Sequence, residues 1–198
     1  MNQNFVKSLL MNNVKGEGRE MIDWEFYDSL HMTASVTQTL TFFQNTIGTV
    51  GRVRTNMKSA GSLPAPQSFA CTGISFHTVS VLDEYDAGGA APSVMPKNAL
   101  FSAFTWDFKL EPSTDFEGFG FDFWKPTMYM NNTGTTLGVA IIPREPYKIK
   151  KFDMPILVPT NRAFSVVATL TLPADVGGFV AATSNLYCTL YGYLRRNS

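Results

Sequence analysis

The C-terminal stretch N-L-Y-C-T-L-Y-G-Y-L-R-R, residues 185–196, alternates between two chemistries along its length. The even positions from 186 to 194 hold small or apolar residues, and tyrosine, threonine and arginine occupy the odd positions from 187 to 195. A period of two predicts a β-strand with one face in a core. A slip of one residue would bury the tyrosines, so the register is well specified. A strand this late in the chain needs a distant partner, which is typical of Greek-key sandwiches.

Seven further stretches have the composition or alternation of strands and are separated by glycine- and proline-rich turns. They are residues 33–44, 67–82, 98–110, 119–130, 136–142, 154–158 and 163–172. Residues 111–118 are predicted to form a turn, and the strand at 154–158, bounded by prolines, suits a sheet edge. Strands in series without helical crossovers predict an all-β sandwich or barrel.

Eight strands in two four-stranded antiparallel sheets make a jelly roll. In that topology the first and last strands are neighbours, so we expect residues 33–44 to lie beside residues 185–196. The predicted organisation is an N-terminal arm at residues 1–32 and a single jelly-roll domain at residues 33–198.

The predicted arm carries apolar residues at roughly helical spacing. They are Phe5, Val6, Leu9, Leu10 and Val14. A short helix is marginal alone in water, so we expect it to order against the body or a neighbouring copy, with Phe5 and Leu9 at the interface. A helix lying on a membrane surface is the alternative, for which only Lys7 and Lys15 supply positive charge.

Composition narrows the function classes. Sixteen basic and sixteen acidic side chains give zero net charge, whereas a protein that grips nucleic-acid phosphates normally has a basic excess. Charged residues are 16% and aromatic residues 13% of the chain. This balance suits a surface that is buried against neighbours or a large aromatic core, and composition leaves both open. We expect no secretory signal peptide and no membrane-spanning segment.

No set of residues typical of an enzyme or a metal site is found. The chain has two histidines, His31 and His77, and lacks the H-x-H pair that a metal-binding cupin would carry. The nucleophile elbow, the P-loop and the C-x-x-C motif are also missing. The cluster Asp83, Glu84 and Asp86 suits either a calcium loop or a solvated turn, and the turn is favoured. We therefore predict no catalytic, cofactor-binding or metal-binding residues.

The two cysteines, Cys71 and Cys188, both lie in predicted strands. A free cysteine there behaves as a small buried apolar residue. A single disulfide between them is the alternative, and the sequence does not decide between the two.

Three segments resemble the jelly-roll capsid proteins of small icosahedral, tailless bacteriophages, several of which have an internal membrane. They are T-N-M-K-S-A-G-S-L-P-A-P-Q-S-F-A-C-T-G-I at 55–74, P-I-L-V-P-T-N-R-A-F-S-V at 155–166, and Y-C-T-L-Y-G-Y-L-R-R at 187–196. The order and spacing of the resemblance cover roughly residues 33–196. The double-barrel members of the family are much longer, so this chain is similar to a single-barrel member.

The resemblance implies a structural, non-enzymatic function in which copies form capsomers of a closed shell. It implies a protein made in the host cytoplasm and located in the virion. Its partners would be other copies, other capsid proteins and, in members that have one, the membrane beneath the shell. No direct contact with nucleic acid is expected. We place Tyr187, Tyr191 and Tyr193 at the contact surface; exposed, hydrogen-bonded tyrosines are the alternative interpretation.

The rival class is a carbohydrate- or receptor-binding jelly roll, such as a spike or vertex protein. It would use aromatic and polar side chains on loops at one end of the sandwich. Alternation places Trp106 with the core residues, so Trp124 is the tryptophan that remains as a loose candidate for a sugar-binding groove.

Overall fold

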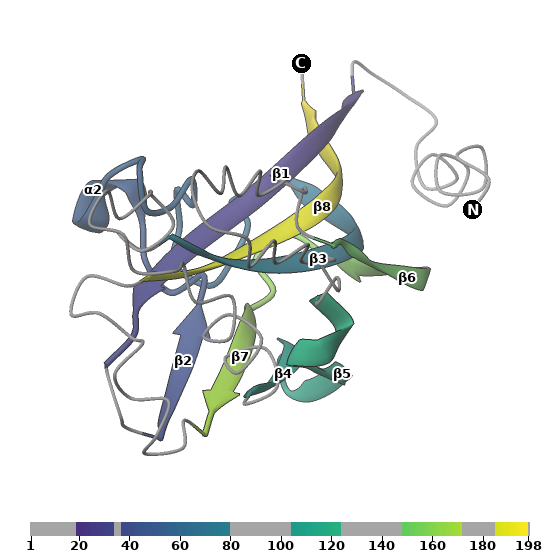
Figure 1. The fold of residues 1–198 in the computed structure, drawn as a ribbon. Helices are drawn as coiled ribbons and strands as arrows, with labels where there is room; N and C mark the ends of the chain where they lie inside the picture. The colour runs from purple at the N-terminus through teal and green to yellow at the C-terminus, as the bar shows by residue number, and fades with distance from the viewer. Residues whose placement is uncertain (1–18, 34–36, 80–103, 124–147, 172–184, 198) are drawn as a thin grey trace, which may run out of the picture.

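The computed structural model describes residues 19–33, 37–79, 104–123, 148–171 and 185–197, which form two stacked β-sheets (Figure 1). Within those residues the chain forms eight strands, one turn of α-helix and one 3₁₀ helix. They are β1 (Arg19–His31), β2 (Gln38–Phe42), α2 (Ile47–Val50), β3 (Ser68–Val79), β4 (Phe104–Leu110), β5 (Ser113–Phe119), η2 (Gly120–Phe123), β6 (Lys150–Val158), β7 (Phe164–Leu170) and β8 (Asn185–Asn197).

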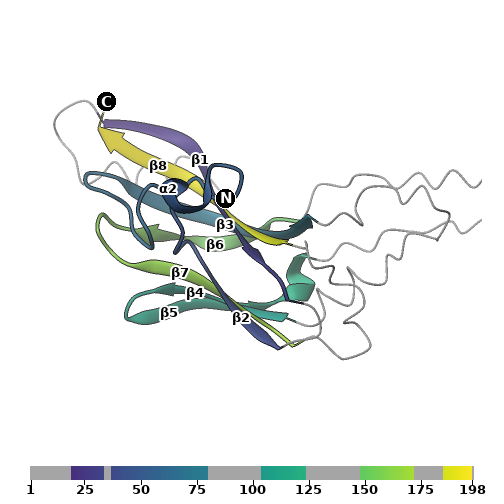
Figure 2. The same ribbon diagram turned by 90° about the vertical axis from the view of Figure 1, so that its left-hand side faces the viewer.

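The strand order is β1-β8-β3-β6 in one sheet and β2-β7-β4-β5 in the other, and all pairs are antiparallel. Figure 2 shows the two sheets as separate layers. The chain alternates between the layers except at the β4–β5 hairpin. This arrangement confirms the predicted jelly roll of two four-stranded antiparallel sheets.

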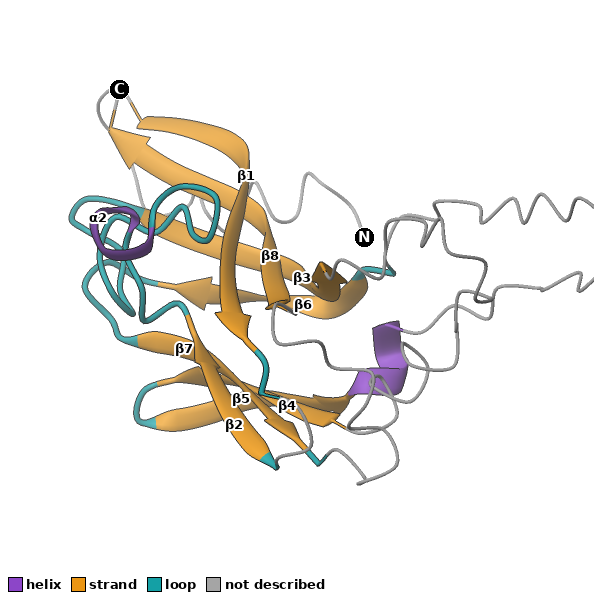
Figure 3. Ribbon diagram, turned by 60° about the vertical axis from the view of Figure 1, so that its left-hand side comes forward, coloured by secondary structure: helices purple, strands orange, loops and turns teal. Residues whose placement is uncertain are grey.

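Strand β8 lies in the middle of its sheet, between β1 and β3 (Figure 3). Its faces are those the alternation predicts, because Leu186, Cys188 and Leu190 are fully buried. A Cβ atom at Gly192 would meet the carbonyl oxygen of Ala70 on β3, so glycine permits the close approach of the two strands.

The predicted partner of this strand is wrong. Residues 38–42 form β2, which pairs with β7 in the opposite sheet. The neighbours of β8 are β3 and β1, and β1 is paired from Arg19 opposite Asn197 to His31 opposite Asn185. Part of the predicted arm is therefore wrong as well: residues 19–31 belong to the sandwich, because Ile22, Phe26 and Leu30 pack on its core. Residues 1–18, with Phe5 and Leu9, lie outside the described residues.

A second correction concerns the β4–β5 hairpin. Residues 113–118, predicted to be a turn, belong to the edge strand β5, and residues 120–123, predicted to be strand, form η2. Gly118 admits the Trp106 side chain, because a Cβ there would lie 2.7 Å from the indole ring. Phe123 of η2 then closes the core, with its ring 5.0 Å from that of Phe76. The strand predicted at 136–142 lies outside the described residues.

Strand β6 occupies a sheet edge, as its prolines predict, and begins at Lys150, four residues before the predicted start. Its pairing with β3 passes from Cys71 opposite Ile156 to Gly73 opposite Lys151. The residues between include Pro155 and bulge away from the ladder, as is common at sheet edges.

The core between the sheets is mainly aromatic. Phe76 of β3 lies at its centre, with ring centroids 5.3 Å from Phe104 and 5.8 Å from Phe42 on the opposite sheet. Such edge-to-face contacts add to the burial of apolar area. The largest fully buried side chains come from both sheets and from the turn after β2: Trp106, Phe42, Phe43, Phe69, Phe76, Phe108, Phe152 and Phe164.

Among the described residues, no helix has the length and apolar character needed to cross a membrane.

Candidate interaction surface

The outer face of the β1-β8-β3-β6 sheet presents the three tyrosines that the sequence singled out. Tyr187, Tyr191 and Tyr193 are half-buried on β8, on the side opposite the leucines. The Tyr187 ring stacks on His77 at 5.0 Å, and the Tyr191 hydroxyl lies 3.1 Å from Ser75 Oγ. The structure therefore brings these tyrosines together on one face. Whether a partner covers them stays a prediction.

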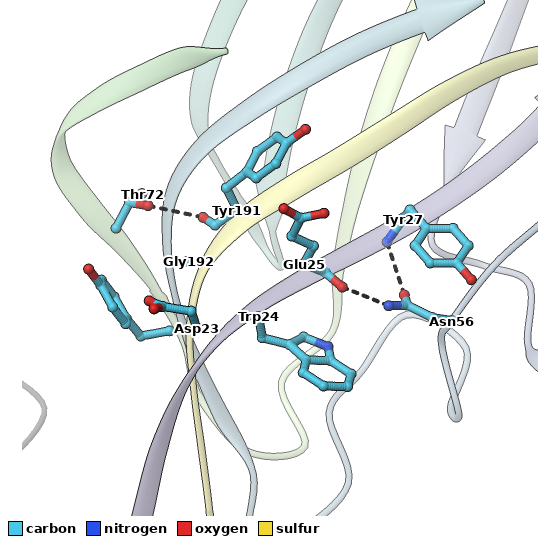
Figure 4. A pocket seen from close by; sticks show the side chains of 9 residues that line it. Asp23, Trp24, Glu25, Tyr27, Asn56, Thr72, Tyr191 and Gly192 are labelled. Atoms are coloured by element: carbon cyan, nitrogen blue, oxygen red, sulfur yellow. Dashed lines mark hydrogen bonds between the residues drawn. The ribbon is translucent and has the colours of Figure 1, made fainter. Parts of the chain in front are cut away.

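A shallow cleft of about 530 Å³ lies over β1 and β8 (Figure 4). Figure 4 shows Glu25 and Tyr191 on one side of the strands and Trp24 on the other, so the cleft wraps the edge of the sheet. Trp24 is 37% exposed, which is unusual for so large an apolar side chain. The lining residues are Asp23, Trp24, Glu25, Tyr27, Asn56, Thr72, Tyr191, Gly192 and Tyr193.

Asn56, in the loop after α2, closes part of the exposed edge of β1. Its Nδ2 donates to the Glu25 carbonyl at 2.6 Å, and its Oδ1 accepts from the Tyr27 N–H at 2.9 Å. The Asn56 N–H donates to the Tyr27 carbonyl at 3.2 Å. One residue thus satisfies backbone groups that an edge strand would leave open, so this part of β1 is closed to strand addition.

The cleft is acidic at its outer rim. The Asp23 and Glu25 side chains are exposed, and within the described residues neither forms an ion pair. Glu20, three residues before Asp23 on the same strand, is paired with Arg196 at 2.9 Å. Asp23 and Glu25 are consequently available to a cation from outside the chain.

The opposite edge of the same sheet is apolar and basic. Met154 is 66% exposed and Leu157 is 43% exposed, both on β6. Lys148 and Lys151 are also exposed and have no acidic partner among the described residues, whereas Lys150 is paired with Asp122 at 2.9 Å. The two edges of one sheet therefore differ in charge.

One carboxylate lies on the inner face of this sheet. Asp28 of β1 is fully buried, and its oxygens accept from the Phe43 N–H at 2.6 Å and the Ser29 N–H at 3.0 Å. Burial raises the pKa of this carboxyl to about 6, although these bonds and those of Thr55 and Asn45 favour the charged form. Asp28 thereby fastens β1 to the end of β2, in the other sheet.

Both cysteines are free thiols in the core. Burial raises the pKa of Cys71 to about 12. Burial, followed by the charges of Asp28 and Cys71, holds the pKa of Cys188 well above its ordinary value. A thiol that stays protonated is a poor nucleophile and a poor metal ligand. No group of three His, Cys, Asp or Glu side chains that could hold a metal occurs among the described residues.

Sequence reasoning placed some of these residues and missed others. Trp106 is buried in the core, as its alternation predicts. The acidic cluster at 83–86 and Trp124 lie outside the described residues. Asp23, Trp24 and Glu25 were assigned to the arm, although the run D-W-E-F-Y already alternates between acidic and aromatic residues. No sequence pattern predicts that Asn56 bonds to the β1 backbone, because this contact depends on the geometry of the loop.

The strand order and layer structure define the class of protein as a jelly-roll β-sandwich. No protein-family model, curated protein or solved structure matches the chain.

Proposed function

We propose that this chain is a structural subunit that self-associates, and specifically a capsid subunit of an icosahedral phage shell. The jelly roll serves viral capsids, lectins and cupins alike, so the fold by itself does not select among these uses. The resemblance of residues 55–74, 155–166 and 187–196 to phage capsid proteins supports the first.

The observation that carries the proposal is the outer face of the β1-β8-β3-β6 sheet. It carries three half-buried tyrosines on one strand. The edges of the sheet add exposed Trp24, which lies on the other side of β1, and exposed Met154 on β6. Tyrosine, tryptophan and methionine are enriched in protein interfaces relative to the rest of the surface. A subunit that is tiled needs such side chains at its edges, where neighbours meet.

The proposed partners are other copies of the chain and other capsid proteins. The proposed location is the virion, after synthesis in the host cytoplasm. In a shell built over a bilayer, the predicted apolar residues Phe5 and Leu9 would face that membrane or a neighbouring copy. The zero net charge supports tiling by protein contacts without direct contact to nucleic acid.

A second function is favoured by one observation, the cleft beside Trp24. The residues that line it include an exposed indole, Tyr193 and the carboxylates Asp23 and Glu25. These groups also suit a sugar ring, since apolar ring faces stack on aromatic side chains and hydroxyls bond to carboxylates. This cleft supports the alternative of a carbohydrate- or receptor-binding module, such as a spike or vertex protein.

Electron microscopy and sedimentation velocity of the purified full chain separate the two functions. Rings, shells or a concentration-dependent increase in sedimentation coefficient are expected for a capsid subunit. A monomer at every concentration that binds members of a glycan array, with binding lost in Trp24→Ala, would overturn the capsid proposal and favour the alternative.

A further inference from the structure

Two rows of outward-facing positions cross the whole β1-β8-β3-β6 sheet. The pairing register defines both, since residues opposite one another on neighbouring strands share a face. One row is Asp23, Tyr193, Ala70 and Leu157, and the other is Glu25, Tyr191, Gly73 and Lys151. Each row therefore begins with a carboxylate on β1 and ends with an apolar or basic residue on β6.

The charges at the two ends are complementary. Asp23 and Glu25 have no ion-pair partner among the described residues, and the same holds for Lys148 and Lys151. A second copy can be placed beside the first so that its β6 edge meets the first copy's β1 edge and the rows continue. Lys151 of the second copy then lies next to Glu25 of the first, and Leu157 of the second copy lies next to Asp23 of the first. Each side also carries exposed groups that would repel the charges of the other side. These groups are Asp153 on β6, and Arg52 and Arg54 in the loop after α2.

Strand polarity allows the same placement. Neighbouring strands alternate in direction across the sheet, so β6 of a second copy lies antiparallel to β1 when it continues this alternation. The backbone edges are nevertheless blunted, by Asn56 on β1 and by the Pro155 bulge on β6. Side chains, and not an extended ladder of backbone hydrogen bonds, must therefore supply the contact.

We infer that the β6 edge of one copy docks on the acidic cleft at the β1 edge of the next, with Lys148 and Lys151 facing Asp23 and Glu25. Leu157 contributes apolar area at the end of the row that holds Tyr193. The contact joins two different surfaces and is therefore heterologous. A rotation between copies closes such contacts into a ring, as a capsomer requires. The inference rests on the proposed self-association and names the surfaces that carry it.

Charge exchange tests this contact with the full chain. Asp23→Lys/Glu25→Lys gives a subunit with two basic edges, and Lys148→Glu/Lys151→Glu gives one with two acidic edges. All four side chains are exposed, so both variants should fold, which circular dichroism and thermal melting check. The matched control for the first variant is Glu111→Lys/Glu117→Lys, which makes the same change in net charge at exposed positions of the β4–β5 hairpin.

Each edge variant alone should associate at least about tenfold more weakly than the wild type in sedimentation velocity, because like charges then face each other. An equimolar mixture of the two edge variants should recover association, since a basic β1 edge then meets an acidic β6 edge. The control should associate like the wild type. Raising the salt to 1 M should weaken the wild-type contact.

The outcomes separate this contact from the proposed function. A wild-type chain that associates, together with edge variants that associate equally well or a mixture that recovers nothing, overturns the β6-to-β1 contact and leaves self-association standing. A wild-type chain that stays monomeric at every concentration overturns both.

Discussion

The two faces of the β1-β8-β3-β6 sheet are made by the same strands and have opposite chemistry. The inner face is mainly apolar and aromatic, with Phe76, Leu190 and the carboxylate Asp28 all buried. The outer face carries tyrosines, exposed carboxylates and exposed lysines. Adjacent residues of one strand therefore have different roles: one stabilises the fold and the next is available to partners.

This difference shows that one sheet can stabilise the fold with one face while the composition of the other face is left free to vary. The fold depends on the contact between sheets, which buries the aromatic core. The outer face can then vary in charge and shape at little cost to the free energy of unfolding. Substitutions at neighbouring positions should separate the two properties, and the predictions below test that separation.

The largest effect is expected for Phe76→Ala, which removes the ring at the centre of the aromatic core. Loss of a buried phenylalanine should lower the free energy of unfolding by about 3–5 kcal/mol, measured by urea denaturation. His77→Ala, the next residue and on the outer face, should lower it by less than about 1 kcal/mol. Equal losses in the two variants would contradict the division of the sheet into two faces.

The next effect concerns Asp28, the buried carboxylate of the inner face. The folded pKa of Asp28, about 6, is above its ordinary value of 3.8, so the folded protein binds this proton more tightly than the unfolded chain. The stabilisation is fully present below pH 3.8 and is lost as the pH rises through 6. The difference in unfolding free energy between wild type and Asp28→Asn should therefore shift by about 2–3 kcal/mol in favour of wild type from pH 8 to pH 3.5.

Urea denaturation of both proteins across that pH range measures this difference. Paired wild-type and variant data cancel the titration of the other carboxyl groups, since these are common to both proteins. A difference that does not change with pH would show that Asp28 titrates near its ordinary value, and would remove the argument that burial dominates its pKa.

On the outer face, Tyr193→Ala should separate association from stability. The free energy of unfolding should change by less than about 1 kcal/mol, while association should weaken by about 2 kcal/mol, or roughly 30-fold, as for an aromatic anchor in an interface. Sedimentation velocity and urea denaturation measure the two quantities. A loss of stability without a loss of association would assign Tyr193 to the fold.

The smallest effect is expected at the two buried thiols. Cys71 and Cys188 are fully buried and have raised pKa values, so a thiol reagent should modify them only when the chain opens. The rate of modification at pH 8 should be far below that of the urea-unfolded chain. Rapid modification of the native protein would contradict the packing of the inner face.

The sequence predicted the fold class from strands in series, and it predicted the faces of β8 because small or apolar residues alternate there with tyrosine and threonine. It missed β1 because Asp28 interrupts the apolar side of its alternation, and a buried carboxylate cannot be recognised without its hydrogen-bond partners. It missed β5 because the short polar edge strand Ser113–Phe119 resembles a turn, whereas the aromatic run after it resembles a strand.

Prediction of the site was limited in the same way. The tyrosines of β8 were found because they share one face of a clear strand. Asp23, Trp24 and Glu25 became visible as a cleft only once β1 was placed beside β8, and Asn56 only once its loop was placed beside β1. Contacts between segments far apart in the sequence depend on topology, which local patterns do not encode.

The central claim is that the outer face of the β1-β8-β3-β6 sheet exists to meet other copies. Electron microscopy of the purified wild-type chain, at a resolution that places the sheets, tests it most directly. Closed rings or shells whose subunit contacts cover Tyr191, Tyr193 and the β1 edge are the expected result. A monomer at every concentration, or an assembly that leaves this face open to solvent, would contradict the account.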